Sequence, residues 1–270
     1  MAEGKNVSGD DKWRKALTEG EAVPIFMRRL FGALPANPRC KMCNAPFKGW
    51  GAPIMRLIGR RQSSKNPRYC EPCAFEESGG AEVGISMLFA DVRASTAIAE
   101  NTPPGEYTHL IQRFYEVATS VLVRHDALID RLMGDEVIGL FVPSFAGPHH
   151  ARQAIEAAQE LRRRMGHLDS DGPWLPLGIG VHSGLTFVGV VQGGPEGLHD
   201  FTVLGDNVNI TARLASTAAA GEILISDAAY AAARLDLGDL EHRELELKGK
   251  SQPVGVRVIA APQIRKAAAA

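Results

Sequence analysis

Hydrophobic residues fall into short runs separated by polar turns over most of the chain after residue 80, and such runs predict strands. In the longest segments the apolar residues recur every three or four positions, as on one face of a helix. We therefore expect strands at 82–90, 127–133, 137–142, 177–182, 187–192, 223–226, 239–247 and 254–259, and helices at 106–125, 149–165 and 206–219. Hairpin turns would join 127–133 to 137–142 and 177–182 to 187–192. This interleaved order is typical of an antiparallel sheet backed by helices, the α+β class.

The first 80 residues differ from the rest in charge. They carry 14 Lys and Arg against 8 Asp and Glu, whereas the remaining residues carry 16 against 23. A chain of 270 residues, 45% of them hydrophobic, can form one large core and a smaller second unit. We expect a flexible N-terminus at 1–35, a small segment at 36–78, the main domain at 81–262 and a tail at 263–270. Within the N-terminus we expect loose chain at 1–20 and a short amphipathic helix at 22–31.

The sequence shows neither a membrane-spanning segment nor a signal peptide. Its apolar runs stay below the roughly 18–20 residues that cross a bilayer. Residues 1–20 are polar and lack the apolar core of a signal peptide. The net charge of −1 argues against a general nucleic-acid-binding protein. We expect a cytoplasmic protein.

All four cysteines lie in the first 80 residues, in two Cys-x-x-Cys pairs separated by 26 residues: Cys40, Cys43, Cys70 and Cys73. Each pair can present two thiolates to one metal ion, and disulfides are disfavoured without a secretory signal. We expect one zinc ion, with an iron–sulfur cluster or redox-active thiols as alternatives. Because so small a segment has little core, the metal would stabilise it. The basic, partly apolar loop between the pairs fits a solvated knuckle, or a surface for an unidentified regulatory partner, anionic lipid, nucleic acid or the main domain.

Two aspartates stand at abrupt ends of apolar runs in the main domain. Asp91 follows the run at 85–90, and Asp135 precedes the run at 137–142. A carboxylate at a strand end or a hairpin tip can point at a ligand, and adjacent strands would bring the two together to bind divalent cations. Taken alone, Asp91 also fits a helix N-cap, and Asp135 also fits a hairpin turn.

A third motif, residues 201–214, passes from a strand-like run into a helix. Asn209 and Arg213 lie four residues apart, so they share one face of that helix. An amide donor beside a guanidinium fork suits negative charge that develops on phosphate oxygens. Either residue alone would equally fit a helix cap or a solvated arginine.

Together these motifs resemble the catalytic domain of the class III adenylate and guanylate cyclases. The resemblance runs from about residue 81 to residue 259. The motifs that carry it, in the family's order, are 89–96, 134–136, 178–184, 202–213 and 247–250. It implies a ferredoxin-like class III nucleotidyl cyclase domain. The cysteine spacing adds a small zinc-knuckle-like segment before this domain. We interpret His182, in the third of these motifs, as structural because nothing beside it requires a base.

The resemblance also implies roles for individual residues. Asp91 and Asp135 would bind two magnesium or manganese ions, Asn209 and Arg213 would stabilise the transition state, and Lys248 would bind the triphosphate. The turn after Asp91 would hold phosphates through its backbone N–H groups, and its residues are Val92, Arg93, Ala94, Ser95 and Thr96. Sites of this family form between two catalytic domains, with the aspartates from one and the Asn and Arg from the other. One domain per chain therefore predicts a homodimer with two equivalent sites.

Two further positions concern the base of the nucleotide. The family's adenine-selecting lysine and its acidic partner correspond here to Arg131 and Thr202. The threonine is similar to that of adenylate cyclases that include bicarbonate-responsive members, whereas an arginine is larger and forked and does not replace a lysine conservatively. The Glu and Cys of guanylate cyclases are absent from these positions. We expect conversion of ATP to 3′,5′-cyclic AMP and pyrophosphate in intracellular signalling, with a catalytically weak nucleotide sensor as the alternative.

Overall fold

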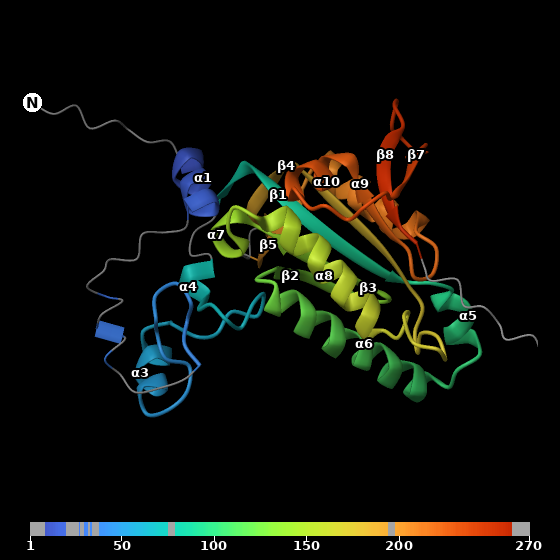
Figure 1. The fold of residues 1–270 in the computed structure, drawn as a ribbon. Coiled ribbons are helices and arrows are strands. Elements are labelled where there is room, and N and C mark those ends of the chain that lie inside the picture. The colour runs from blue at the N-terminus through green and yellow to red at the C-terminus, as the bar shows by residue number, and fades with distance from the viewer. Residues whose placement is uncertain are drawn as a thin grey trace, which may run out of the picture.

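The strand β1 (Gly79–Val92) lies in the middle of the sheet and is paired along both sides. The computed structural model describes residues 9–19, 27, 30, 31, 33, 38–74, 79–193 and 198–260. Within these residues eight strands form one sheet in the order β2-β3-β1-β4-β6-β8-β7, and β5 pairs with β4 (Figure 1). The other strands are β2 (Leu128–Met133), β3 (Glu136–Phe141), β4 (Leu177–Gly193), β5 (Leu198–Leu204), β6 (Ile223–Ser226), β7 (Glu241–Leu245) and β8 (Val254–Ile259). This sheet with its helices confirms the α+β class.

Both faces of β1 are buried. Its side chains point alternately to the two faces, so Leu88 and Ala90 pack into one core while Met87 and Phe89 pack into a second core on the other face. A strand covered on both faces needs apolar residues at nearly every position, which explains the unbroken apolar run before Asp91. The helices of the main domain are α5 (Ser95–Glu100), α6 (Pro104–Arg124), α7 (Pro143–Ala146), α8 (His150–Arg164), α9 (Asp206–Thr217) and α10 (Asp227–Ala233).

Helices α6 and α8 cover the face of the sheet that carries Leu88 (Figure 1). Helix α6 begins at Pro104, where the missing N–H costs nothing, and buries Ile111, Phe114 and Val121. This is the helical spacing on which the prediction for 106–125 rested. Helix α9 packs on the opposite face, against β4 and β1, and this placement brings its exposed side to the end of β1.

One predicted hairpin is wrong. The sequence predicted a turn between strands at 177–182 and 187–192, but β4 runs through this region without a break. Gly184 pairs with Ile85 of β1 and does not form a turn. A Cβ at Gly184 would lie 2.5 Å from the Cγ of Asn207, so the glycine serves a close approach of α9 to the sheet. Because β1 has 14 residues, 14 of the 17 residues of β4 have a partner on it, and β4 continues without a turn.

A second difference lies at the N-terminus, where residues expected to be loose form the helix α1 (Gly9–Glu19). Leu17 is only 1% exposed. The indole of Trp13 lies over the first residue of β1, since a Cβ built on Gly79 would be 2.8 Å from the Nε1 of Trp13. Burial of these apolar side chains orders the helix. The helix expected at 22–31 lies mostly outside the described residues.

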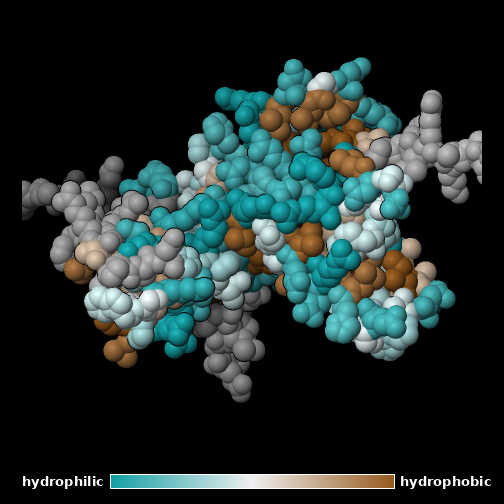
Figure 2. Space-filling view, turned by 60° about the horizontal axis from the view of Figure 1, so that its bottom comes forward, coloured by the Kyte–Doolittle hydropathy of each residue, from teal (hydrophilic) through white to brown (hydrophobic). Residues whose placement is uncertain are grey.

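Residues 38–74, called here the four-cysteine segment, lie beside β2 and the end of α6 (Figure 1). The segment contains two short helices, α3 (Gly51–Leu57) and α4 (Glu71–Ala74). Its exposed large apolar side chains are Trp50, Ile54, Leu57 and Ile58. In the space-filling view, hydrophobic residues gather in separate patches on a mostly polar face (Figure 2). Among the helices of the described residues, none combines the length and the apolar content needed to cross a membrane.

The buried His167 makes folding stability depend on pH. Its Nε2 accepts the backbone N–H of Leu177 at 3.0 Å, which requires a neutral ring. Burial, helped by the charge of Arg162, lowers the pKa of His167 from 6.5 to about 4. Between these values the unfolded chain binds the proton and the folded protein does not, so stability falls as the pH falls through this window and is unaffected by His167 above it. The loss would reach about 3 kcal/mol at the acid end.

We expect His167→Gln to reduce this acid loss, because the amide oxygen can still accept the N–H of Leu177 but does not titrate. Urea unfolding of both proteins at about pH 7 and about pH 4.5 measures the difference. Equal loss of stability in the two proteins would show that His167 is not the group responsible.

Candidate active site

Asp91 and Asp135 lie next to each other at one end of the sheet. Asp91 pairs in register with Glu136, the first residue of β3. The backbone N–H of Val92 donates to the carbonyl of Asp135 at 3.0 Å, which joins the end of β1 to the turn between β2 and β3. The structure thus brings together the two carboxylates that stand 44 residues apart in the sequence.

The turn that carries Asp135 is held in place by a hydrogen bond from helix α6. Gly134 adopts a positive φ of 61°, which glycine tolerates best. The hydroxyl of Tyr115, on α6, donates to the carbonyl of Gly134 at 2.7 Å. Burial, together with the charge of Asp135, raises the pKa of Tyr115, so this donor keeps its proton. The sequence did not indicate this contact, because Tyr115 fits the apolar face of the helix equally well.

Two further side chains contact the aspartates directly. The guanidinium of Arg93 forms an ion pair with the carboxylate of Asp91 and donates to the carbonyl of Ser216, on α9, at 2.6 Å. The hydroxyl of Ser95 donates to the carboxylate of Asp135. The sequence predicted Arg93 and Ser95 in a phosphate-binding turn and did not indicate these side-chain contacts. One feature of the sequence could have indicated the ion pair: Arg93 is the second residue after Asp91, and residues at this spacing point to the same side of an extended chain.

The turn after β1 has fewer free N–H groups than its sequence suggests. The N–H of Val92 is bonded to Asp135, and that of Arg93 donates to the carbonyl of Pro176 at 2.8 Å. Ala94 adopts a left-handed conformation with φ of 56° and precedes α5 without a side-chain cap. Phosphate contacts from this turn would therefore come from Ala94 and the start of α5, and not from Val92 and Arg93.

The oxygen donors at this end of the sheet fit hard divalent cations. Asp91 and Asp135 offer carboxylate oxygens, the ligands that magnesium and manganese prefer. Glu136 lies beside them, and burial together with the charge of Asp135 raises its pKa. The neighbouring carboxylates thus concentrate negative charge that a bound cation would balance.

Helix α9 presents Asn209 and Arg213, and a buried histidine fixes the first turn of that helix. The Nδ1 of His182 lies 2.8 Å from the hydroxyl of Ser226, and its Nε2 lies 2.8 Å from the side-chain oxygen of Asn207, in the first turn of α9. Burial lowers the pKa of His182, so its ring stays neutral. His182 therefore has the structural role that the sequence predicted, while its partner Asn207 was missed.

An open cavity of about 450 Å³ lies between the end of β1 and α9. Its lining residues are Asp91, Asp135, Glu136, Asn209, Ala212, Arg213 and Ser216. Both aspartates and both residues of α9 therefore line one cavity within a single chain. The division of the site between two chains, which the family resemblance implies, stays a prediction.

The remaining predicted site residues lie outside the lining of this cavity. Arg131 is an exposed residue of β2 whose Nε lies 3.5 Å from a carboxylate oxygen of Asp130. Thr202, on β5, is buried. The exposed Lys248 precedes Gly249, and a Cβ built there would lie 3.7 Å from the guanidinium of Arg213, so its turn lies beside α9.

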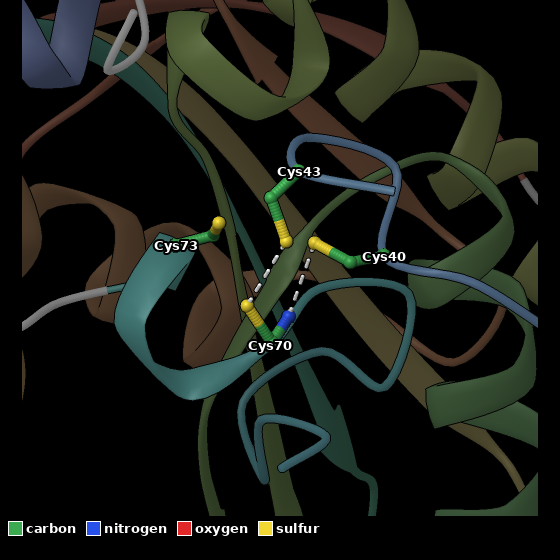
Figure 3. A group of neighbouring side chains, drawn as sticks. All are labelled: Cys40, Cys43, Cys70 and Cys73. Atoms are coloured by element: carbon green, nitrogen blue, oxygen red, sulfur yellow. Dashed lines mark hydrogen bonds between the residues drawn. The ribbon is translucent and has the colours of Figure 1, made fainter. Parts of the chain in front are cut away.

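The four cysteines form a second cluster, inside the four-cysteine segment (Figure 3). All are buried and reduced, with their sulfur atoms within 4.8 Å of one another; they are Cys40, Cys43, Cys70 and Cys73. The pKa of Cys40 is lowered, chiefly by hydrogen bonds from Cys43 and Cys70, whereas that of Cys73 is raised, chiefly by its hydrogen bond to Cys40. The guanidinium of Arg60 lies 3.7 Å from the sulfur of Cys70. The predicted gathering of the two pairs is present, and the buried sulfur set could hold a metal ion.

The family follows from the match of residues 81–259 to the model of the adenylate and guanylate cyclase catalytic domain. Because this match covers more than half of the chain, the protein belongs to that family. Class III cyclases use divalent metals, which agrees with the oxygen donors at the end of β1. The cyclase fold expected from the sequence is thereby confirmed.

Two solved structures and one sequence relative illustrate the likeness. The adenylyl cyclase CyaB from P. aeruginosa has 26% identity and a TM-score of 0.60, covering 70% of this chain and 98% of its own. The guanylyl cyclase Cya2 has 26% identity and a TM-score of 0.58, with the same coverage. The uncharacterized protein Rv1318c of Mycobacterium tuberculosis strain H37Rv is 30% identical over 184 residues, 65% of this chain and 32% of that protein. The chain thus spans about a third of the length of the curated relatives that it matches.

Proposed function

We propose that this protein is an adenylate cyclase that converts ATP to 3′,5′-cyclic AMP and pyrophosphate as a homodimer. The observation that carries the proposal is the single cavity lined by Asp91, Asp135, Asn209 and Arg213. It places oxygen ligands for cations opposite donors suited to phosphate oxygens, as transfer of a phosphoryl group requires. In the reaction the ribose 3′-oxygen attacks the α-phosphorus in line, the bond from this phosphorus to the β-phosphate oxygen breaks, and pyrophosphate leaves with the bonding electrons.

Four residues of the cavity, and Lys248 beside it, each have one task in this proposal. Asp91 and Asp135 would hold two magnesium or manganese ions, which favour loss of the 3′-hydroxyl proton and balance charge on the triphosphate. Asn209 and Arg213 donate to the phosphate oxygens as negative charge develops there. Lys248, on the turn beside Arg213, binds the triphosphate. Most of the rate enhancement would then come from positioning and charge, because the protein forms no covalent bond to the nucleotide.

The homodimer would complete the site. The cavity of one chain is open, and Arg131 and Thr202 lie outside its lining. A second copy would close the cavity and supply the surface that reads the base. In this arrangement two equivalent sites would form across one twofold axis.

The choice of ATP over GTP rests on Arg131 and Thr202. The two solved relatives with equal identity include one adenylyl and one guanylyl cyclase, so fold likeness does not select the base. Thr202 resembles the adenylate cyclases that include bicarbonate-responsive members, and a hydroxyl can bond the adenine edge. The contact of Arg131 with Asp130 favours the second candidate, a nucleotide sensor with little turnover, because this contact holds the guanidinium beside its own strand.

Turnover of ATP and of GTP by the purified protein with Mn²⁺ or Mg²⁺ tests the proposal. We expect cyclic AMP to exceed cyclic GTP, and we expect Arg131→Lys to raise kcat/KM for ATP several-fold by restoring a single ammonium donor. Nucleotide binding without turnover, unchanged by Arg131→Lys, would support the sensor instead. Bicarbonate added to the same assay tests whether the protein responds to it, as some adenylate cyclases with a threonine at the position of Thr202 do.

For the second cluster we propose one zinc ion on Cys40, Cys43, Cys70 and Cys73. Sulfur atoms around a tetrahedral zinc lie about 3.8 Å apart, given Zn–S bonds of about 2.3 Å. The four sulfur atoms, all within 4.8 Å of one another, are close to this arrangement. Elemental analysis of the purified protein distinguishes zinc from iron.

A further inference from the structure

The four-cysteine segment is hydrogen-bonded to the outer side of β2, which is an edge strand of the sheet. The N–H of Ile129 donates to the carbonyl of Lys65 at 2.7 Å, and the ammonium of Lys65 donates to the carbonyl of Asp130 at 2.7 Å. The buried side-chain amide of Asn66 donates to the carbonyl of Ala127, also at 2.7 Å. The segment thus supplies hydrogen bonds that an edge strand otherwise lacks.

On its other side β2 pairs with β3, and this pairing is interrupted at the same residues. β2 pairs with β3 at residues 128–129 and again at 132–133, and the register shifts between these two stretches. Arg131 lies in the interval. Such an irregularity removes ladder bonds and lets a strand bend. The residues just before Arg131, Ile129 and Asp130, are those that the four-cysteine segment contacts by hydrogen bonds.

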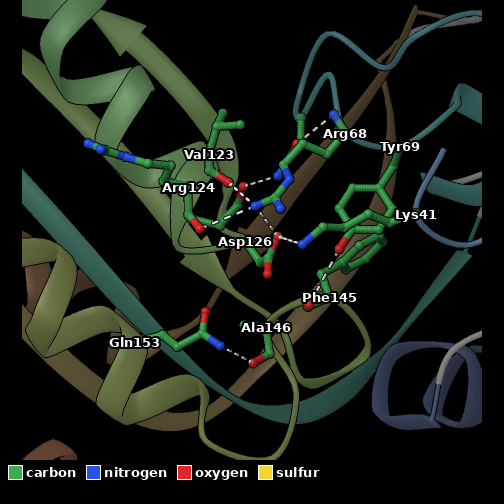
Figure 4. A network of polar contacts seen from close by, with 11 residues as sticks. Lys41, Arg68, Tyr69, Val123, Arg124, Asp126, Phe145, Ala146 and Gln153 are labelled. Atoms are coloured by element: carbon green, nitrogen blue, oxygen red, sulfur yellow. Dashed lines mark hydrogen bonds and ion pairs between the residues drawn. The ribbon is translucent and has the colours of Figure 1, made fainter. Parts of the chain in front are cut away.

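A second set of contacts fixes the turn that enters β2 (Figure 4). The ammonium of Lys41 and the guanidinium of Arg68 lie 2.6 Å and 2.8 Å from the same carboxylate oxygen of Asp126. Arg68 also donates to the carbonyls of Val123 and Arg124, at the end of α6, at 3.1 Å and 3.2 Å. Lys41 lies inside the first cysteine pair and Arg68 lies two residues before the second. The stretch with the first cysteine pair and the stretch with the second, called here the two arms of the segment, are thereby both joined to this turn.

The two arms are themselves held together mainly around the sulfur atoms. The N–H of Lys41 donates to the carbonyl of Arg68 at 2.9 Å, and the N–H of Cys70 donates to the sulfur of Cys40 at 3.4 Å. The cysteines form a large part of the buried side chains of the segment. A segment this small does not keep its shape by core packing alone, so a bound ion would decide whether the arms stay together.

We infer that the four-cysteine segment, with one zinc ion bound to its thiolates, is a clamp that keeps β2 in register and so positions Arg131 for the nucleotide base. Its position-setting contacts are those of Lys65 and Asn66 with β2 and of Arg68 with Asp126. Arg131 is the residue positioned, and its role in binding the base rests on the cyclase function proposed above.

Hydrogen exchange of the full chain, before and after removal of the metal with a mercurial thiol reagent and a chelator, tests the clamp directly. We expect about one zinc per chain before treatment. After removal, amides of residues 127–133 should exchange at least roughly tenfold faster, while those of β6 and β8 at the far side of the sheet keep their protection. Absence of bound metal, or unchanged exchange in β2 after its removal, would overturn the inference.

A variant that leaves the cysteines intact separates docking from metal binding. We expect Arg68→Ala to retain its zinc, to increase exchange in β2, and to raise KM for ATP roughly three- to tenfold with a smaller change in kcat. Lys48→Ala, which removes an exposed basic side chain of the same segment, is the matched control and should leave all three quantities unchanged. An Arg68→Ala protein with normal exchange in β2 would contradict the clamp.

The exchange and metal measurements do not depend on catalysis. If the wild-type protein makes no cyclic nucleotide but β2 loosens when the metal leaves, the clamp stands and the cyclase proposal fails. If turnover is normal and β2 keeps its protection without metal, the cyclase proposal stands and the clamp fails.

Discussion

Asp91→Asn and Asp135→Asn, made separately, should each lower kcat for cyclic AMP formation by about a hundredfold or more. The substitution keeps the size of the side chain but removes a negative charge that would face the proposed cations. Loss of roughly 3 kcal/mol of transition-state stabilisation corresponds to a factor of more than a hundred in rate. Initial rates at saturating ATP, measured across a range of Mn²⁺ concentrations, give kcat and the apparent metal affinity together.

A matched control distinguishes lost chemistry from lost structure. Asp239→Asn removes an exposed carboxylate in the turn before β7 and should retain full activity. Thermal unfolding of all three variants should remain close to wild type, because the two aspartates are neighbours of Arg93 and Ser95 at the surface of the site and not part of the core. An Asp135→Asn enzyme with normal kcat would exclude the two-metal site.

The same variants show whether one chain or two build the site. Arg213→Ala should also be nearly inactive, because alanine cannot supply the two guanidinium donors that the arginine offers to phosphate oxygens. If Asp135 of one copy works with Arg213 of the other, mixing the two inactive variants creates mixed dimers with one complete site. Random pairing would then restore about a quarter of the wild-type activity. No recovery in exchanging dimers would show that each chain supplies both residues to its own site.

Gly180→Ala should lower both stability and activity, although position 180 lies inside the sheet and touches no substrate. A Cβ at this position of β4 would lie 2.5 Å from the backbone N of Ala215 and 2.8 Å from the carbonyl of Thr211. Backbone atoms cannot rotate away, so α9 would have to move off the sheet. We expect a loss of about 1–3 kcal/mol in the free energy of unfolding. Displacement of Asn209 and Arg213 by about 1 Å would lower kcat by up to a hundredfold.

Gly84→Ala is the control for this prediction. Gly84 lies on β1, the strand that pairs with β4, and a Cβ there meets no atom within 4 Å. Alanine in a strand is favoured over glycine by about 0.5–1 kcal/mol, so Gly84→Ala should be neutral or slightly stabilising. Urea unfolding and kcat of the two variants give the comparison. Equal effects at the two positions would show that the contact between α9 and β4 does not set the geometry of the site.

The sequence predicted most of the sheet and the position of the aspartates because these depend on local pattern. Runs such as 85–90 and 137–142 are apolar whether or not their partners are known. The wrong hairpin at 177–192 shows the limit of this reasoning. Gly184 has the composition of a turn, but its reason for being glycine is Asn207, more than twenty residues later. A local pattern cannot distinguish a glycine that turns from one that lets a helix approach.

The contacts that orient the site were predicted less well, for the same reason. Tyr115, Arg93 and Asn207 contact the carbonyl of Gly134, the carbonyl of Ser216 and the ring of His182, which only the fold brings close to them. Likewise, the cysteine spacing predicted that the sulfur atoms would meet, but nothing in it indicated the place of docking. Lys41 and Asp126 are 85 residues apart, and the sequence offers many other acidic residues with which that lysine could have formed an ion pair.

The length of β1 has a mechanical consequence. At about 3.3 Å per residue its 14 residues span roughly 46 Å, from the indole of Trp13 at one end to the carboxylate of Asp91 at the other. Hydrogen bonds to β3 and β4 prevent it from sliding or stretching by itself. A force applied at Gly79 would therefore not be taken up by a local change of conformation, whereas a loop would take it up in that way. The force would be transmitted through the paired strands to the carboxylate of Asp91 at the far end of β1.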